Sequence, residues 1–417
     1  MVNLFTFDKE LKLKMADKII ILFCYFLLLV DSLNGFLIQN NIPIPVSLLY
    51  KNLFIGFVLI RVLRQQKEMT DIYLILLYVA VLVFSYGFHA SGLALGPTLV
   101  HLIKFLTTII LYKYFKNLIT EHGWPVFPYL SRIFVINGVV LMGSILLGPF
   151  GLGYRQYGES FSFRGFFYAG NELSGAFLII APFLLYLFLY TRKKITNYYY
   201  LLCILLMAVG VLIGTKTGLI AIFLSIIYVH RTYFLQKKQV SLAHKVAAPL
   251  IKVLMVVILV AVTANYIQES GSWSRWEYLY SKGGLSELIF SSRDRYWSVE
   301  KIEFLEAGVF DKFLGLGGAR TVEMDVHDTL LNYGYLGLCV VYGFFALLFW
   351  RAFRAKRFTP FFKLVLFVDG MFIMASTLSG HLIFSGTSNT FIALINAFIF
   401  FNHITDKTNE KESTATV

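Results

Sequence analysis

The segment AGNELSGAFLIIAPFLLYLFLY at residues 169–190 decides the class of fold. It opens with two polar side chains, and no charged residue follows Glu172 up to Tyr190. A helix needs roughly 20 consecutive apolar residues to cross the hydrocarbon core of a bilayer. The length and composition of this segment therefore predict a membrane-spanning helix.

Similar apolar runs recur along the chain, which is 58% hydrophobic and only 15% charged. A soluble protein with so few polar residues could not cover its own surface. We expect an all-α, polytopic membrane protein with about twelve transmembrane helices. The predicted spans are residues 19–38, 45–63, 72–89, 98–116, 130–148, 169–190, 198–214, 216–230, 249–267, 328–350, 362–379 and 384–403.

The distribution of Lys and Arg predicts how these spans are oriented. With the N-terminus in the cytoplasm, every alternate loop is rich in Lys and Arg, as cytoplasmic loops usually are. An even number of spans then returns the C-terminus to the cytoplasm. The net charge of +13 is spread over many loops, which argues against a nucleic-acid partner. Two loops are predicted on the opposite side, residues 149–168 and 268–327.

The chain divides accordingly into four parts. Residues 1–267 are expected to form a membrane domain of nine helices, and residues 328–403 a second one of three helices. Between them, residues 268–327 are too polar for lipid and too long for a simple connection. The tail, 404–417, has the composition of a disordered cytoplasmic segment.

The long loop is rich in cations, aromatic residues and glycine. Residues 293–304 have helical periodicity that would place five apolar side chains on one face at the membrane interface. Basic residues kept on the side that membrane topology disfavours indicate a task that involves an anion. The five apolar residues are Tyr296, Trp297, Val299, Ile302 and Phe304.

Three cations are candidate anion ligands. Arg293 and Arg295 lie in the sequence SSRDRYW, and a guanidinium binds phosphate through two hydrogen bonds. Contact with lipid headgroups is the alternative explanation for these arginines. Lys216 lies in GTKTG (214–218), a glycine-rich turn before a helix, where an ammonium can contact an anion. An exposed turn lysine is the alternative there, and the spacing does not match a nucleotide-binding P-loop.

Polar residues at the mouths of two spans are further candidates. Asn171 and Glu172 begin the span 169–190, at a depth where polar groups usually have a partner. Capping of the helix by Asn171 is the competing explanation. His381 belongs to a Ser-Gly-His sequence that is expected at the same side of the membrane.

His327 is the candidate general base. It lies between Asp325 and Asp328 at the start of a span, and an imidazole near carboxylates can take a proton near neutral pH. A purely structural histidine is the alternative. The spacing of these three residues is a weak match to a metal site, and we predict no metal.

Taken in order, these residues resemble the O-antigen ligase/polymerase superfamily. The resemblance rests on Ser292-Arg293 with Trp297, on Gly315 and Gly317, and on His327 followed by Leu330, Gly334 and Gly337. Arg164 with Gly170-Asn171, and the basic residue within 214–218, are similar to two upstream motifs of that family. The similarity covers residues 164–337 in the expected order and sidedness.

The resemblance implies a membrane glycosyltransferase of the GT-C type that uses polyprenyl-diphosphate-linked glycans and no cofactor. Arg293 and Lys216, with Arg164 and Arg295, would hold the diphosphate, and His327 would activate the acceptor hydroxyl. Lys216 stands where arginine is common in the family. Asp328 stands where asparagine is common, so the base can be shared among His327, Asp325 and Asp328.

We predict that the protein polymerises lipid-linked repeat units outside the cytoplasmic membrane of a bacterium. The expected partners are this lipid-linked oligosaccharide, membrane lipids, a flippase and a chain-length regulator. One alternative is a ligase that moves glycan to a lipid, wall polymer or protein. A second is a transporter of lipid-linked oligosaccharide, although few charges, chiefly Lys104 and Asp369, lie inside the spans.

Overall fold

The chain is almost entirely helical in the parts that the structure, a computed structural model, describes. The predicted spans at 72–89, apart from residue 79, and at 249–267, and the tail 404–417, lie outside this part. The described residues are 11–65, 79, 95–156, 162–192, 196–236, 272–291, 293–317, 320–355, 359 and 361–401.

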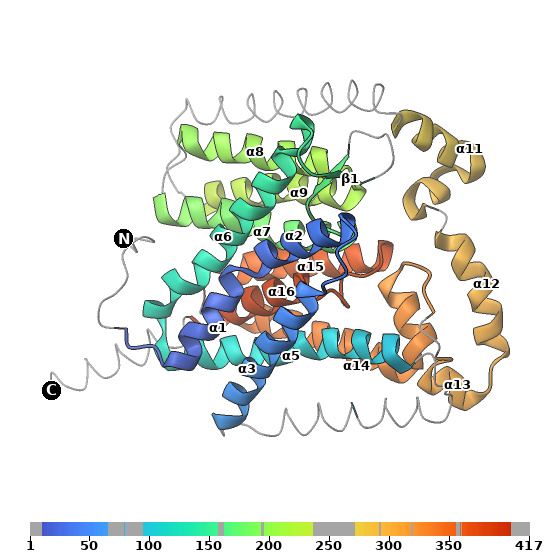
Figure 1. The fold of residues 1–417 in the computed structure, drawn as a ribbon, viewed down its shortest axis with the longest axis horizontal. Coiled ribbons are helices and arrows are strands. Elements are labelled where there is room, and N and C mark those ends of the chain that lie inside the picture. The colour runs from blue at the N-terminus through green and yellow to red at the C-terminus, as the bar shows by residue number, and fades with distance from the viewer. Residues whose placement is uncertain are drawn as a thin grey trace.

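The centre of the molecule is α7 (Gly170–Arg192), which is packed on several sides by other helices (Figure 1). Its residues Phe177, Ile180 and Phe183 are at most 1% exposed. A helix that is apolar on all faces is expected to be surrounded in this way. The other helices of the bundle are α1 (Met15–Tyr25), α2 (Leu27–Gln39), α3 (Val46–Arg64), α5 (Leu95–His122), α6 (Phe127–Leu146), α8 (Asn197–Ile213), α9 (Lys216–Gln236), α14 (Asp325–Arg354), α15 (Phe362–Leu378) and α16 (Ser388–Ala397), with short 3-10 turns η1 (Trp124–Val126), η2 (Gly148–Phe150) and η4 (Phe398–Phe400).

Each predicted span within the described residues overlaps a helix, but the helices differ in length. Four stretches are long and apolar enough to cross a membrane: Val46–Arg64, Trp124–Phe150, Gly170–Tyr190 and Asp325–Arg354. The pair α1 and α2, bent by 48°, makes a fifth if it is one span. The structure thus confirms an all-α, multi-pass membrane protein, whereas the number twelve stays a prediction.

The bend between α1 and α2 has a cause far along the chain. The side chain of Asn137, in α6, donates to the carbonyl of Cys24 at 2.8 Å and accepts from the amide of Leu28 at 2.9 Å. Both backbone groups lie at the break of the helix, where the regular hydrogen bonds are lost. A buried amide side chain therefore satisfies the backbone that the bend exposes.

The interval between the two predicted membrane domains forms three helices at one end of the bundle (right in Figure 1). They are α11 (Ser272–Phe290), which is kinked at Gly283 and Gly284, α12 (Arg293–Glu306) and α13 (Val309–Leu314). We call them the α11–α13 layer. The prediction that this interval carries short helices is confirmed.

The apolar residues of α12 do not share one face, so that prediction was wrong. Phe304 is 2% exposed and packs with Val322, Met324 and Leu331, and Trp297 lies against the same cluster. The other three side chains face outward, with exposed fractions of 61% for Tyr296, 69% for Val299 and 59% for Ile302.

Among the described residues, one two-stranded hairpin interrupts the helical pattern. Strands β1 (Tyr154–Arg155) and β2 (Phe163–Gly165) pair antiparallel in the loop that precedes α7. Gly165 has a φ of +59° and packs against Ser144, so a side chain there would be both strained and blocked. The hairpin fixes the path of the chain into the first turn of α7.

Candidate active site

The turn between α15 and α16, residues 379–387, organises the polar region at the end of the bundle beside the α11–α13 layer. We call it the α15–α16 connection. The carboxylate of Asp325 accepts the backbone N–H groups of His381 (2.5 Å), Leu382 (2.9 Å) and Ile383 (2.8 Å). Asp325 is only 1% exposed. A carboxylate that accepts three amides is a rigid anchor for the backbone.

Asp328 has a similar task on the other side of His327. Its Oδ1 accepts the backbone N–H of Val322 at 2.6 Å, and the side chain is 6% exposed. It thereby fixes the segment that leads into α14. The prediction from the sequence left the role of base shared among His327, Asp325 and Asp328. In the structure both carboxylates accept backbone amides. Each aspartate therefore helps to shape the loop around the histidine.

Arg293, the first residue of α12, faces Glu323. Its Nε and Nη2 lie 3.3 Å and 3.2 Å from Oε2 of Glu323, and its Nη1 donates to the carbonyl of Leu378 at 3.1 Å. The arginine side chain is 16% exposed and the glutamate side chain 54% exposed. The α12 helix, the segment before α14 and the end of α15 thus meet at one guanidinium.

His327, in the first turn of α14, contacts α12 one turn along from Arg293. Its ring contacts the indole of Trp297, with ring centroids 4.2 Å apart and planes at 57°. Trp297 follows Arg293 by four residues in α12, so these two side chains lie on the same face of that helix. The Nδ1 atom of His327 is buried and has no hydrogen-bond partner within the described residues.

Lys216 joins the same region from α9. Gly214, with a φ of +68°, ends α8, and α9 begins at Lys216 with Thr215 accepting the N–H of Gly218. The ammonium donates to Oγ of Ser291 at 2.9 Å, two residues before Arg293. The structure therefore brings together two of the predicted diphosphate ligands, which are 77 residues apart in the sequence.

His381 is close enough to the Lys104–Glu172 and Arg293–Glu323 ion pairs for their charges to act on its imidazole. Burial lowers the pKa of its imidazole below the ordinary value of 6.5, the charges of Glu172 and Glu323 raise it, and those of Lys104 and Arg293 lower it further. It has the left-handed φ of +68°, which is strained for a residue with a side chain. The predicted association of His381 with the other site residues therefore agrees with the electrostatics of its surroundings.

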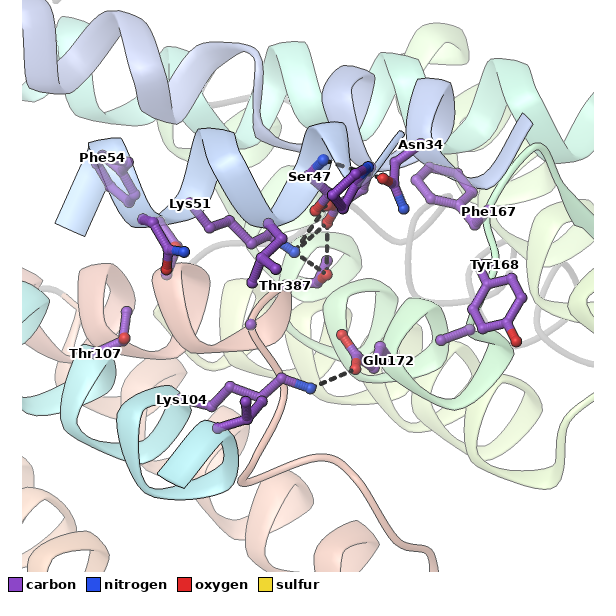
Figure 2. A pocket seen from close by; sticks show the side chains of 18 of the residues that line it. Asn34, Ser47, Lys51, Phe54, Lys104, Thr107, Phe167, Tyr168, Glu172 and Thr387 are labelled. Carbon is purple, nitrogen blue, oxygen red and sulfur yellow. Dashed lines mark hydrogen bonds and ion pairs between the residues drawn. The ribbon is translucent and has the colours of Figure 1, made fainter. Parts of the chain in front are cut away.

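A cavity of about 500 Å³ lies on the α15–α16 connection, which contributes Gly386 and Thr387 to its lining (Figure 2). Helices α2, α3, α5 and α7 and the α15–α16 connection line it, and polar and apolar side chains contribute to the lining in similar numbers. On one wall Lys51 contacts both oxygens of Asp31, at 2.8 and 2.9 Å, and Oγ1 of Thr387 at 3.2 Å. Ser47 and Thr387 also donate to Asp31, at 2.5 and 2.6 Å.

Glu172 lies on the opposite wall of the cavity, in the first turn of α7 (Figure 2). Its carboxylate accepts from Lys104 at 3.4 Å and from Ser385 of the connection at 3.0 Å. We expected a polar group at this depth to have a partner, and the partner of Glu172 is Lys104 of α5. Asn171 is half-buried within the first turn of the same helix, which begins at Gly170, so it does not occupy the cap position.

Two predicted site residues make their contacts elsewhere. Arg164 donates to the carbonyl of Tyr168 at 2.8 Å and approaches Gln39 at 3.5 Å, so it supports the turn beside the cavity. Arg295 is 54% exposed and pairs with the buried carboxylate of Glu287 in α11 at 2.5 Å. The described contacts do not bring either arginine to Arg293.

Several residues of this region were missed by reasoning from the sequence. Asp31 and Lys51 are charges within predicted spans, which is a signal that was available because such charges usually have a function or a partner. Glu323, Ser385 and Thr387 carry no comparable local signal. Within the described ranges, no group of three or more His, Cys, Asp and Glu side chains is arranged to hold a metal ion.

Apolar helices long enough to span a bilayer, with a polar cluster at one end of the bundle, define the chain as a multi-pass membrane protein. The family model of O-antigen ligase like membrane proteins matches residues 13–281, which is more than half of the chain. The protein belongs to this family, and its function is of the membrane O-antigen ligase or polymerase type, a glycosyltransferase-type activity. The match ends before α12, and no curated protein matches the chain.

Proposed function

We propose that the protein polymerises polyprenyl-diphosphate-linked oligosaccharide units into surface polysaccharide at the outer face of a bacterial cytoplasmic membrane. About twelve spans in a GT-C-like arrangement, with both termini in the cytoplasm, belong to this proposal. A flippase would deliver the lipid-linked units, and a chain-length regulator would limit the product. The site residues are those of the polar region at the end of the bundle.

The observation that carries the proposal is the convergence of Arg293, Lys216 and His327 beside the α15–α16 connection. Lys216 donates to Ser291, two residues before Arg293, and His327 contacts Trp297, one turn after Arg293 in α12. Two cations next to a half-buried imidazole are what a transfer from a sugar diphosphate requires. The match to a ligase-like membrane family supports the same chemistry.

In the proposed reaction an acceptor hydroxyl attacks the anomeric carbon of the donor glycan. The new glycosidic C–O bond forms as the bond between the anomeric carbon and the diphosphate oxygen breaks. His327 takes the hydroxyl proton. The leaving diphosphate gains negative charge, which Arg293 and Lys216 stabilise. Asp325 and Asp328 keep the loop around the histidine in shape, and neither is the base in this scheme.

Arg164, Arg295 and Asn171 take more distant parts in the proposal. Arg164 supports the turn beside the cavity, and Arg295 pairs with a carboxylate of α11. The cavity lined by Glu172, Lys51 and Lys104 would accommodate part of a lipid-linked substrate. Membrane lipids are the expected neighbours of the exposed apolar helix faces.

Ligation of a finished glycan to another acceptor is the second candidate, and the description of the matched family favours it. The two reactions share donor, leaving group and base. They differ in the acceptor, which is a second lipid-linked unit for a polymerase and a different lipid, wall polymer or protein for a ligase.

The test is complementation of a deletion strain with Arg293→Ala or His327→Ala, followed by gel analysis of surface polysaccharide. Loss of one oxyanion-stabilising group typically lowers a rate by about 10²–10³-fold, so we expect almost no polymer, with single lipid-linked units and protein level intact. Arg295→Ala is the matched control, because it removes an arginine of the same helix that contacts α11 instead.

Other outcomes would reject parts of the proposal. Long glycan that accumulates on its lipid without attachment would indicate a ligase. Absence of lipid-linked units from the outer leaflet would indicate a transporter. Equal loss of polymer in the Arg295→Ala and Arg293→Ala strains would remove the special role of Arg293.

A further inference from the structure

Glu323 is a strained residue of the site that the proposed mechanism does not use. Its φ is +58°, in the left-handed region that residues with side chains seldom adopt. Such strain is kept where the surrounding structure holds a residue in place, and it is concentrated at functional sites. The neighbouring Thr321 hydroxyl accepts the backbone N–H of Glu323 at 3.3 Å.

The backbone of Glu323 is fixed from a second side by Gly380. A Cβ atom on Gly380 would lie 2.6 Å from the carbonyl carbon of Glu323 and 2.7 Å from its Cα, so only glycine permits this approach. The α15–α16 connection thus presses against the strained residue. The carboxylate is thereby directed to Arg293 even though it is 54% exposed.

The contact occupies the part of the guanidinium that an anionic ligand needs. One oxygen of Glu323 accepts from Nε and Nη2, and the carbonyl of Leu378 accepts from Nη1. Arginine binds phosphate through a pair of parallel N–H donors. A phosphate can gain the Nε and Nη2 pair only if Glu323 leaves it.

We propose that Glu323 is an internal competitor that limits how tightly Arg293 binds an anion and speeds the release of the product. The inference rests on the proposed function of Arg293 as a diphosphate ligand. A diphosphate offers more charge and more oxygens than a carboxylate and displaces Glu323. A single phosphate must displace Glu323 as well, so the carboxylate weakens the binding of both anions by the same factor.

The same contact assists release of the product. When the bond to the anomeric carbon breaks, its electron pair stays on the diphosphate oxygen, and the leaving group carries more negative charge than the substrate. A cationic site alone would hold this product more tightly than the substrate. The return of Glu323 to Arg293 replaces the diphosphate and frees the site for another turnover.

Binding of inorganic pyrophosphate and of inorganic phosphate to the purified full-length protein tests the inference. A half-exposed ion pair contributes little, so we expect Glu323→Gln to bind pyrophosphate and phosphate each about three- to tenfold more tightly. Glu323→Asn is the second variant, since asparagine tolerates the left-handed backbone and also removes the charge. A gain of affinity is not what a damaged fold produces.

Glu303→Gln is the matched control, because it removes a carboxylate of similar exposure (59%) that pairs with Arg320 and not with Arg293. Equal gains of pyrophosphate affinity in Glu323→Gln and Glu303→Gln would mean that the effect comes only from the change in net charge, and they would overturn the inference. Arginine-dependent binding that is unchanged in both Glu323 variants would also overturn it, with the proposed function intact. No binding by any variant, or binding that survives Arg293→Ala, would refute the proposed role of Arg293 itself.

Discussion

The α15–α16 connection and the α11–α13 layer both contribute to the polar region, but they are held in different ways. The connection is fixed through its backbone, by the three amides on Asp325, and it is mostly buried. The layer packs through the cluster around Phe304 and is also held by pairs of charged side chains at its surface. Examples are Arg320 with Glu300 and Glu303, at 2.7 and 2.5 Å, in which every partner is at least 27% exposed.

The two kinds of contact have different consequences. Buried backbone contacts fix the shape of the site, whereas exposed ion pairs can open and let a side chain bind another partner. Buried amides on a carboxylate cannot be replaced by water without a large loss, so the connection keeps one geometry. Exposed ion pairs open at small cost. Arg293 lies between the two regions, with a backbone carbonyl of α15 on one side and the exposed carboxylate of Glu323 on the other.

The largest expected effect is on the connection. Asp325→Ala leaves three backbone N–H groups without their acceptor, and breaking a buried charged network of this kind costs about 3–5 kcal/mol. We expect a strong loss of thermal stability in detergent, a low protein level in the membrane and, consequently, no polymer. Asp325→Asn keeps one acceptor oxygen and should lose only part of this stability. A stable but inactive Asp325→Ala protein would instead mean that Asp325 takes part in the chemistry.

A smaller effect is expected on the cavity wall. Lys51→Met leaves the carboxylate of Asp31, which is 10% exposed, with hydroxyl donors only, and we expect a loss of about 1–3 kcal/mol in thermal unfolding. Lys51→Arg, which keeps the charge, should lose less. The double variant Lys51→Met/Asp31→Asn should be more stable than the sum of the single losses predicts, because both partners are removed together. Simple additivity would show that the pair contributes nothing of its own.

The fold was predictable to the extent that it depends on local pattern. Apolar length placed the helices, since each run must satisfy its own backbone in lipid. The bend between α1 and α2 was not predictable, because the side chain that stabilises it is Asn137, more than a hundred residues further along the chain. Likewise the two faces of α12 depend on the cluster around Phe304, which the periodicity of α12 alone does not reveal.

The site was predictable in part for the same reason. Lys216 and Arg293 were singled out by residue type and by the side of the membrane, and the structure brings them together through Ser291. The roles of Asp325 and Asp328 were not foreseen. Asp325 has partners 56 to 58 residues away, so nothing in the sequence around His327 distinguishes an anchor from a base.

The smallest expected effect is on the α11–α13 layer, and it depends on pH. The Arg320 guanidinium lowers the pKa of Glu303 below its ordinary value of 4.5. A lowered pKa in the folded state means that the pair stabilises the protein above pH 4.5 and that this contribution is lost as the pH falls through the lowered value. Because Glu303 is 59% exposed, Arg320→Gln should cost only about 0.5–1 kcal/mol at neutral pH. Thermal unfolding of both proteins should show this gap at pH 7, and it should narrow below pH 4.5 and in high salt, which screens exposed charges. A gap of several kcal/mol that salt leaves unchanged would mean that the layer is held as rigidly as the connection.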